Sequence, residues 1–368
     1  MSFSFHIAQP GDDPEIRSLL QRNPVQGRVE VSYEREPNYF LGCRASGDFS
    51  QVIVARQNET GELAAVACRA VRQMFLDGME EQVGYLSQLR VDDRFRGRWL
   101  VSKGFRYLRD LHEDGRAPGG YLATITREGK TASGILVALA RSHFPRFEPL
   151  ADVSTVAISV SRKRVKRCSR VETSDATRDE LDEVVAFLRE VGRHRQFFPV
   201  YTRDDLDGQG TAAPSVSEFV LARRAGRLVG VLGLWDQCAF KQAVVRGYAP
   251  AFGRIVPIYN ALMKLRRRPG VPAVGERIRF VFASAVCVAN SDEEAFSALL
   301  AHAHNRAATG GFDYLMIGFA TRDPFLEAAR RYTNIEYHST LYGVHWSVAR
   351  GYRERLDDRT PYVEIAAL

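Results

Sequence analysis

The chain has 368 residues, more than one ordinary hydrophobic core organises, so two domains of about 100–200 residues are expected. Hydrophobic residues make up 45% and charged residues 26%, which excludes a mainly disordered, collagen-like or coiled-coil chain. The net charge is +7, and only six of the 51 basic residues are lysine; the excess favours an anionic ligand without identifying it.

The first part of the chain alternates strands and helices in an order that predicts one compact unit. The expected elements are a strand at 3–8, a helix opening at Asp13-Pro14, an antiparallel hairpin at 51–55 and 63–71, a third strand at 83–91, a helix from 100 to Gly119-Gly120, a strand at 121–126, a helix at 131–141 and a hairpin at 147–160. Because a helix separates the strands at 83–91 and 121–126, we expect them to be parallel. The basic run at 162–167 then marks a boundary, either as a phosphate-binding patch or as a solvated linker.

The second part repeats this order imperfectly. The expected elements are a helix after a capping box at 177–180, a hairpin at 219–231, a helix around 259–265 within an inserted stretch at 249–275, a strand at 277–289, a helix capped by Ser291-Asp292 and a strand at 312–319. A helix, a Gly-Gly pair, a strand and a Thr-Arg pair occur in both parts, ending at Thr126-Arg127 and at Thr321-Arg322. The repeat predicts a duplicated fold with domains at 1–160 and 161–368.

The sequence predicts neither a metal site nor a disulfide framework. The five cysteines are odd in number, widely spaced and without a CxxC pair, and His302 and His304 are two apart on a predicted helix, hence on different faces. The first residues lack a basic stretch followed by an apolar core, and no apolar run reaches the roughly 20 residues of a membrane helix. We therefore expect a cytoplasmic protein with no membrane partner.

The segment from Leu89 to Val101 is the one motif that carries chemistry, because a basic loop there joins a strand end to a helix start. Unpaired N–H groups and a partial positive charge at a helix N-terminus suit a pyrophosphate. The segment resembles the acyl-CoA-binding loop of the GNAT superfamily of N-acetyltransferases, V-x-x-x-x-R-G-x-G-x-G/A, which Val91, Arg96 and Gly97 match. Trp99 and Val101 stand where the family usually has glycine, a departure also found in N-myristoyltransferases, which are tandem GNAT folds.

The resemblance implies an α/β (α+β) fold of two GNAT-like domains, each a mixed, mostly antiparallel twisted sheet flanked by helices. It implies acetyl-CoA or another acyl-CoA as cosubstrate, held in the first domain. The residues implied for this site are Leu89, Arg90, Val91, Arg96, Gly97, Arg98, Trp99, Leu100 and Val101. The alternative interpretation is structural, with the loop's arginines paired to carboxylates such as Asp92, Asp93 or Asp110.

The corresponding junction of the second part has neither glycine nor arginine. Asp292, Glu293 and Glu294 fill the first helical turn there, where they satisfy the helix dipole and repel a pyrophosphate. The second domain is therefore not expected to bind CoA in the usual way.

No catalytic residue is identified. Many GNAT enzymes protonate the CoA thiolate with a tyrosine near the last hairpin, and the matching positions here are Ser142 in the first domain and Tyr332 in the second. The polar candidates for a base on the third strand are Tyr85, Ser87 and Gln88.

We therefore predict an acyl-CoA-dependent N-acyltransferase whose first domain holds the cosubstrate and whose interdomain groove holds a small-molecule or peptide amine. Acceptor choice is expected to lie in variable segments at 27–50 and 249–275. The alternative is a noncatalytic, degenerate GNAT module that binds an acyl-CoA or a protein partner. Nucleic-acid binding through 162–167 and 266–268 is a third, less favoured hypothesis, which predicts a steep salt dependence.

Overall fold

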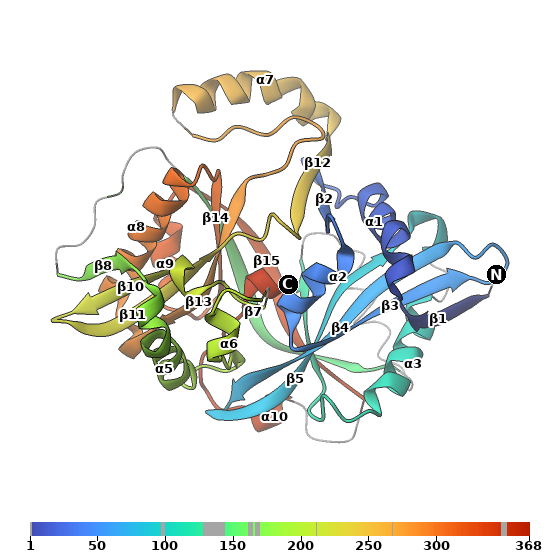
Figure 1. Cartoon of the computed structure of the whole chain (residues 1–368). Coiled ribbons are helices and arrows are strands. Elements are labelled where there is room, and N and C mark those ends of the chain that lie inside the picture. The colour runs from blue at the N-terminus through green and yellow to red at the C-terminus, as the bar shows by residue number, and fades with distance from the viewer. Residues whose placement is uncertain are drawn as a thin grey trace.

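The computed structural model shows one long mixed sheet that runs through both halves of the chain and is flanked by helices, which confirms the expected α/β class (Figure 1). The residues that it describes are 2–96, 100–127, 144–160, 165, 170–210, 212–266, 268–346 and 352–368. The helix predicted at 131–141 and most of the basic run at 162–167 lie outside the described residues.

The N-terminal half, on the right in Figure 1, follows the predicted order closely. Its elements are β1 (Phe3–Ile7), α1 (Asp13–Arg22), β2 (Val29–Glu34), α2 (Tyr39–Cys43), β3 (Phe49–Gln57), β4 (Leu63–Leu76), β5 (Met79–Val91), α3 (Leu100–His112), β6 (Tyr121–Thr126) and β7 (Arg146–Ser159). The antiparallel pairing of β3 with β4 and the parallel pairing of β5 with β6 confirm both predictions. Ile16, Leu19 and Leu20 of α1, at helical spacing, are buried in a cluster with residues of β3 and β4.

The C-terminal half contains the second set of elements. These are β8 (Glu172–Asp175), α5 (Leu181–Gly192), β9 (Phe198–Pro199), α6 (Arg203–Leu206), β10 (Phe219–Arg224), β11 (Arg227–Trp235), β12 (Gln242–Tyr248), α7 (Pro250–Leu265), β13 (Phe280–Val288), α8 (Glu293–Thr309), β14 (Tyr314–Ala320), α9 (Phe325–Arg330), β15 (Asn334–His345) and α10 (Tyr352–Arg355). The predicted capping box forms, since Glu180 Oε2 accepts hydrogen bonds from the Thr177 N–H at 2.8 Å and the Thr177 hydroxyl at 2.9 Å. Asp292 caps α8 by accepting from the N–H groups of Glu294 and Ala295.

The two halves exchange their last strands. The sheet order is β1-β3-β4-β5-β6-β15-β7-β14-β13-β11-β10-β8, so β15 pairs with β6 and β7, and β7 pairs with β14. The predicted hairpin at 147–160 is therefore wrong. This segment is one strand because its partners come from the other half of the chain, and Pro149, which lacks an N–H donor, lies at an irregularity in the β7–β15 register.

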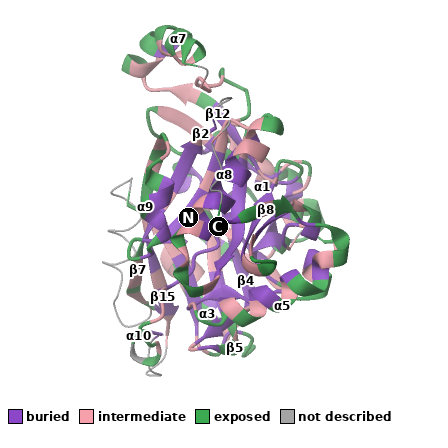
Figure 2. Ribbon diagram, turned by 90° about the vertical axis from the view of Figure 1, so that its left-hand side faces the viewer, coloured by how far each residue is buried: buried purple, intermediate pink, exposed green. Residues whose placement is uncertain are grey.

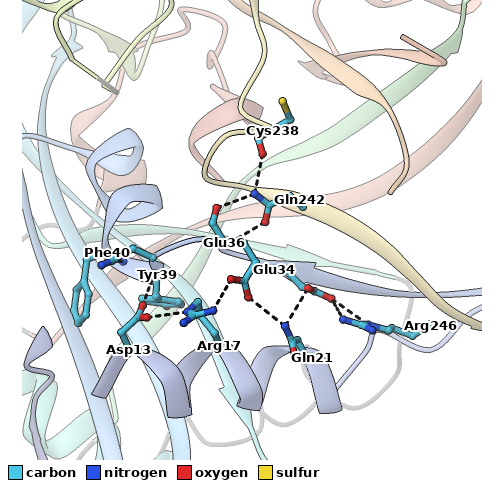
Figure 3. A network of polar contacts seen from close by, with 11 residues as sticks. Asp13, Arg17, Gln21, Glu34, Glu36, Tyr39, Phe40, Cys238, Gln242 and Arg246 are labelled. Atoms are coloured by element: carbon cyan, nitrogen blue, oxygen red, sulfur yellow. Dashed lines mark hydrogen bonds and ion pairs between the residues drawn. The ribbon is translucent and has the colours of Figure 1, made fainter. Parts of the chain in front are cut away.

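Two segments from different halves form an arm beside the sheet. β2 pairs antiparallel with β12, and α7 follows β12 at the far end of the arm (Figures 1 and 2). A polar network holds the base of this arm (Figure 3): Arg246 pairs with Glu34, the Glu36 N–H donates to Gln242 Oε1 at 2.9 Å, and Arg17 pairs with Glu36. The segments at 27–50 and 249–275, in which we expected acceptor choice to lie, also contact each other, since the Ala249 N–H donates to the Arg28 carbonyl at 3.0 Å.

Within the described ranges, no helix combines the length and apolarity that crossing a bilayer requires. No group of three or more His, Cys, Asp or Glu side chains among these residues is placed to hold a metal.

Candidate functional site

A gap opens between β5 and β6 in the N-terminal half. These parallel strands pair at only three positions, the last being Leu86 opposite Ala123, and then diverge, β5 continuing along β4 and β6 along β15. At the closed end the strands are very close, since a Cβ on Gly84 would lie 2.2 Å from Cδ1 of Tyr121. Among the described residues no other strand pairs with Ser87–Val91 from the gap side, so this edge of β5 lacks a strand partner there.

A β-bulge interrupts β5 on the edge of this gap. Gln88 has a φ of +57°, and between Ser87 and Arg90 β5 has one residue more than the facing part of β4. A bulge releases backbone groups from the regular ladder and aims them elsewhere. The bulge therefore lies where the two strands separate.

The loop after β5 is anchored by the buried carboxylate of Asp92. Its Oδ1 accepts from the N–H and the Nε of Arg94, both at 3.0 Å, and its Oδ2 accepts from Nε of Arg22 at 2.8 Å. Burial by itself raises the pKa of Asp92, but the hydrogen bonds from Arg94 and Arg22 outweigh burial and lower this pKa to about 2. The end of β5 is thereby tied to α1.

Arg96, a predicted contact for the pyrophosphate, has an exchangeable partner. Its Nη2 lies 2.6 Å from Oδ1 of Asp93, and the two side chains are 64% and 66% exposed. Such an exposed ion pair contributes only about 0–1 kcal/mol, so a more highly charged anion can replace Asp93. Both Arg94 and Arg96 thus pair with carboxylates, as the structural interpretation of the loop predicted. Only the carboxylate that pairs with Arg94, that of Asp92, is buried.

The remaining predicted residues lie at the strand end and the helix start. Leu89 is exposed, Arg90 and Val91 are half-buried, and Arg90 Nη1 donates to the Leu89 carbonyl at 3.0 Å. Leu100 begins α3 and is buried with residues of β1 and β4, while Val101 is half-buried. Three predicted residues lie outside the described part of the chain: Gly97, Arg98 and Trp99.

The C-terminal half has the same divergence of strands, but there the chain fills the gap itself. β13 and β14 pair in parallel at three positions, and β13 has a bulge at Ala285, whose φ is +50°. The Ala285 N–H donates to Oε2 of Glu364 at 2.9 Å, and a Cβ on Gly318 of β14 would lie 2.1 Å from Cγ2 of Ile365. Residues of the C-terminal segment therefore stand between the diverging strands.

A small cavity of about 30 Å³ lies between the halves, near the closed end of the β5–β6 gap. Its lining includes Arg72 and Tyr85 from the N-terminal half and Tyr362 and Glu364 from the C-terminal segment. Tyr85 is opposite Leu122, one residue before the last β5–β6 pair. Burial raises the pKa of Tyr85 to about 12, so its hydroxyl stays protonated at neutral pH.

Comparisons with known proteins find similar structures but no similar sequence. No protein-family model matches the chain, and no curated protein matches its sequence. A GCN5-related N-acetyltransferase from Sphaerobacter thermophilus aligns with a TM-score of 0.56 at 12% identity, over 99% of this chain and 98% of that chain. N-myristoyltransferase from Saccharomyces cerevisiae, solved with bound myristoyl-CoA, aligns with a TM-score of 0.62 at 10% identity, over 93% of this chain and 82% of that chain. The chain has the GNAT fold.

Several sequence candidates prove to be packing residues of this GNAT fold. The rings of Tyr332 and His304 lie 5.5 Å apart, and Tyr332 packs against the core of the C-terminal half. His302 is buried and its Nε2 lies 3.2 Å from Oδ1 of Asp175. Ser142 lies outside the described residues.

Sequence reasoning missed the position of Glu364 in the second gap of the GNAT fold. No local motif marks this residue, and its contacts join segments 79 residues apart. The repeat in the sequence was the available signal. A duplicated strand arrangement implies a second gap, which a segment of the chain can fill.

Proposed function

We propose that this protein is an acyl-CoA-dependent N-acyltransferase, with the acyl-CoA in the β5–β6 gap and an amine acceptor in the groove between the halves. The comparison of the two gaps supports this proposal most strongly. In the second gap the bulge N–H of Ala285 binds a carboxylate oxygen of Glu364. The matching bulge residue of the first gap is Gln88, whose N–H suits a carbonyl oxygen in the same way.

The first gap offers groups that fit the successive parts of an acyl-CoA. The free edge of Ser87–Val91 can pair with the amides of the pantetheine arm, as an added strand pairs with a sheet edge. The N-terminus of α3 and the exposed guanidinium of Arg96 suit the pyrophosphate. We include the segment Gly97–Val101 in the same proposed site.

The proposed chemistry is attack of a neutral amine on the thioester carbon that an acyl-CoA supplies. The N–H of Gln88 would stabilise the negative charge that develops on the carbonyl oxygen. The protonated hydroxyl of Tyr85, near the closed end of the gap, would donate to the departing thiolate as the carbon–sulfur bond breaks. The proton that the nitrogen loses on forming the amide would restore this hydroxyl, so that amine and acyl-CoA become amide and free CoA thiol. The second half would not bind CoA, because the Glu364 carboxylate already occupies its bulge.

Calorimetric titration with acetyl-CoA tests the cosubstrate site. We expect the unmodified protein to bind and the double variant Arg96→Glu, Arg98→Glu to bind at least about tenfold more weakly, because charge-assisted contacts to the pyrophosphate are lost. Arg227→Glu, at the exposed first residue of β11 in the other half, changes charge without touching the loop and serves as the control. Equal affinity for the parent and the double variant would remove the site from this loop.

A noncatalytic acyl-CoA-binding module is the second candidate function. It is favoured by Trp99 and Val101, which stand where the GNAT loop usually has glycine. Release of free thiol from acetyl-CoA with a panel of amines separates the two candidates, since a binding module holds the acyl-CoA without releasing thiol.

A further inference from the structure

The part of the arm from Gln237 to Gly275, which contains β12 and α7, is basic and does not belong to the proposed acyl-CoA site. From Gln237 to Gly275 the sequence has seven basic residues and no acidic residue, so this stretch alone equals the net charge of the chain, +7. Two of these basic side chains have partners at the base of the arm, Lys241 with the C-terminal segment and Arg246 with Glu34. The others lie on α7 or directly after it.

One face of α7 exposes large apolar side chains. Ile255, Ile258, Leu262 and Leu265 are 51%, 72%, 41% and 82% exposed. Their spacing of three and four residues places them in a single stripe along the helix. Two exposed arginines border this stripe, Arg254 on one side and Arg266 on the other.

The opposite face of α7 packs on the segment that returns toward β13. Asn260 Nδ2 donates to the Val271 carbonyl at 3.0 Å, and its Oδ1 accepts from the Val271 N–H at 2.8 Å. Figures 1 and 2 show the returning segment between α7 and the rest of the molecule. The apolar stripe therefore faces away from the protein, and no other part of the described chain projects beyond it.

We propose that α7 docks the protein on an anionic lipid surface, with the helix lying flat, its apolar stripe between the headgroups and its basic residues on the lipid phosphates. An amphipathic helix with arginine and lysine beside an apolar face has this mode of binding, and it needs no spanning helix. This proposal departs from the sequence expectation of no membrane partner, which rested only on the lack of a helix that could cross the bilayer.

The charge and the apolar stripe of α7 together favour a lipid surface over a second copy of the chain or a polynucleotide. A second copy docked on the same stripe would place two basic surfaces without acidic residues against each other, which like-charge repulsion opposes. A polynucleotide would neutralise the basic residues but leave the four exposed apolar side chains in water. An anionic bilayer neutralises the basic residues and also removes the four apolar side chains from water.

Sedimentation of the full-length protein with lipid vesicles tests the proposal. We expect binding to vesicles of phosphatidylcholine with phosphatidylglycerol, little binding to phosphatidylcholine alone, and loss of binding at high salt. The variant Ile258→Ser, Leu265→Ser should bind at least about tenfold more weakly, and Arg254→Glu about fivefold or more. Met79→Ser, which removes a 66% exposed apolar side chain from the β4–β5 turn, is the matched control and should bind like the parent.

Each contrary outcome overturns the proposal. Equal binding by the parent and the Ile258→Ser, Leu265→Ser variant would mean that α7 is not the docking element. A parent that is dimeric by ultracentrifugation and becomes monomeric in this variant, without vesicle binding, would assign the stripe to a second copy. Binding of oligonucleotides but not of vesicles would assign the arm to nucleic acid. Unchanged thermal unfolding of the variants shows that they are folded.

Discussion

Replacing Asp92 with asparagine removes the charge that holds the loop after β5 to α1. The pKa of this carboxyl is lowered from 3.8 to about 2, because hydrogen bonds from Arg94 and Arg22 favour the ionised form more than burial opposes it. This difference corresponds to about 2 kcal/mol of stability at neutral pH. The unfolded chain protonates this carboxyl near 3.8 and the folded protein only near 2, so the contribution is complete above the first value and is lost as pH falls through the second.

Urea unfolding, followed by tryptophan fluorescence, measures the effect. We expect Asp92→Asn to lower the free energy of unfolding by about 2 kcal/mol at about pH 7 and by roughly half as much at about pH 3. Asp93→Asn is the matched control, because its carboxylate is 66% exposed and pairs with the exposed Arg96; its loss should stay below about 1 kcal/mol. A loss for Asp92→Asn no larger than that of the control, or one that does not shrink toward low pH, would refute the reasoning.

Three further predictions concern the two gaps. Tyr85→Phe should lower the rate of acyl transfer about a hundredfold while acyl-CoA affinity, measured by calorimetry, stays unchanged, because only a proton donor is lost; an unchanged rate would exclude this role. Arg96→Ala should weaken acyl-CoA binding by about tenfold with little effect on unfolding, since its present partner is an exposed carboxylate. Glu364→Leu should lower the free energy of unfolding by about 2 kcal/mol and leave acyl-CoA affinity unchanged, because it removes the acceptor for the Ala285 N–H in the other gap; a change in affinity without a change in stability would contradict the assignment of the gaps.

Local patterns in the sequence predicted much of the fold. Helical spacing located α1 and α5, the turn between 57 and 63 located the β3–β4 hairpin, and the helix between β5 and β6 predicted their parallel direction. These features depend on residues close in the chain, where spacing and turn residues determine the outcome. The α7 helix begins nine residues before the predicted start at 259, because Pro250 can open a helix while Gly253 and Pro257 weaken its pattern.

The sequence also determined that a basic loop lies between a strand and a helix. It did not determine which arginines of this loop pair with buried carboxylates and which pair with exposed ones. The structure pairs Arg94 with buried Asp92 and Arg96 with exposed Asp93, a difference in burial that spacing does not encode. The stretch 237–275, with seven basic residues and no acidic residue, carries a larger basic excess than this loop, which has four arginines and two aspartates.

Only the tertiary structure decided how the two halves combine. Three contacts join segments that are far apart in the chain: β15 pairs with β7, β2 pairs with β12, and Glu364 enters the second gap. Pairing between strands that are distant in sequence depends on which sheet edges are free and on which side chains fit together. The local hydrophobic period of a sequence contains no information on either. The sequence therefore determined that there are two related halves. Packing determined that the chain's own Glu364 carboxylate closes the second gap, while no described strand pairs with the first-gap edge of β5 beyond Leu86.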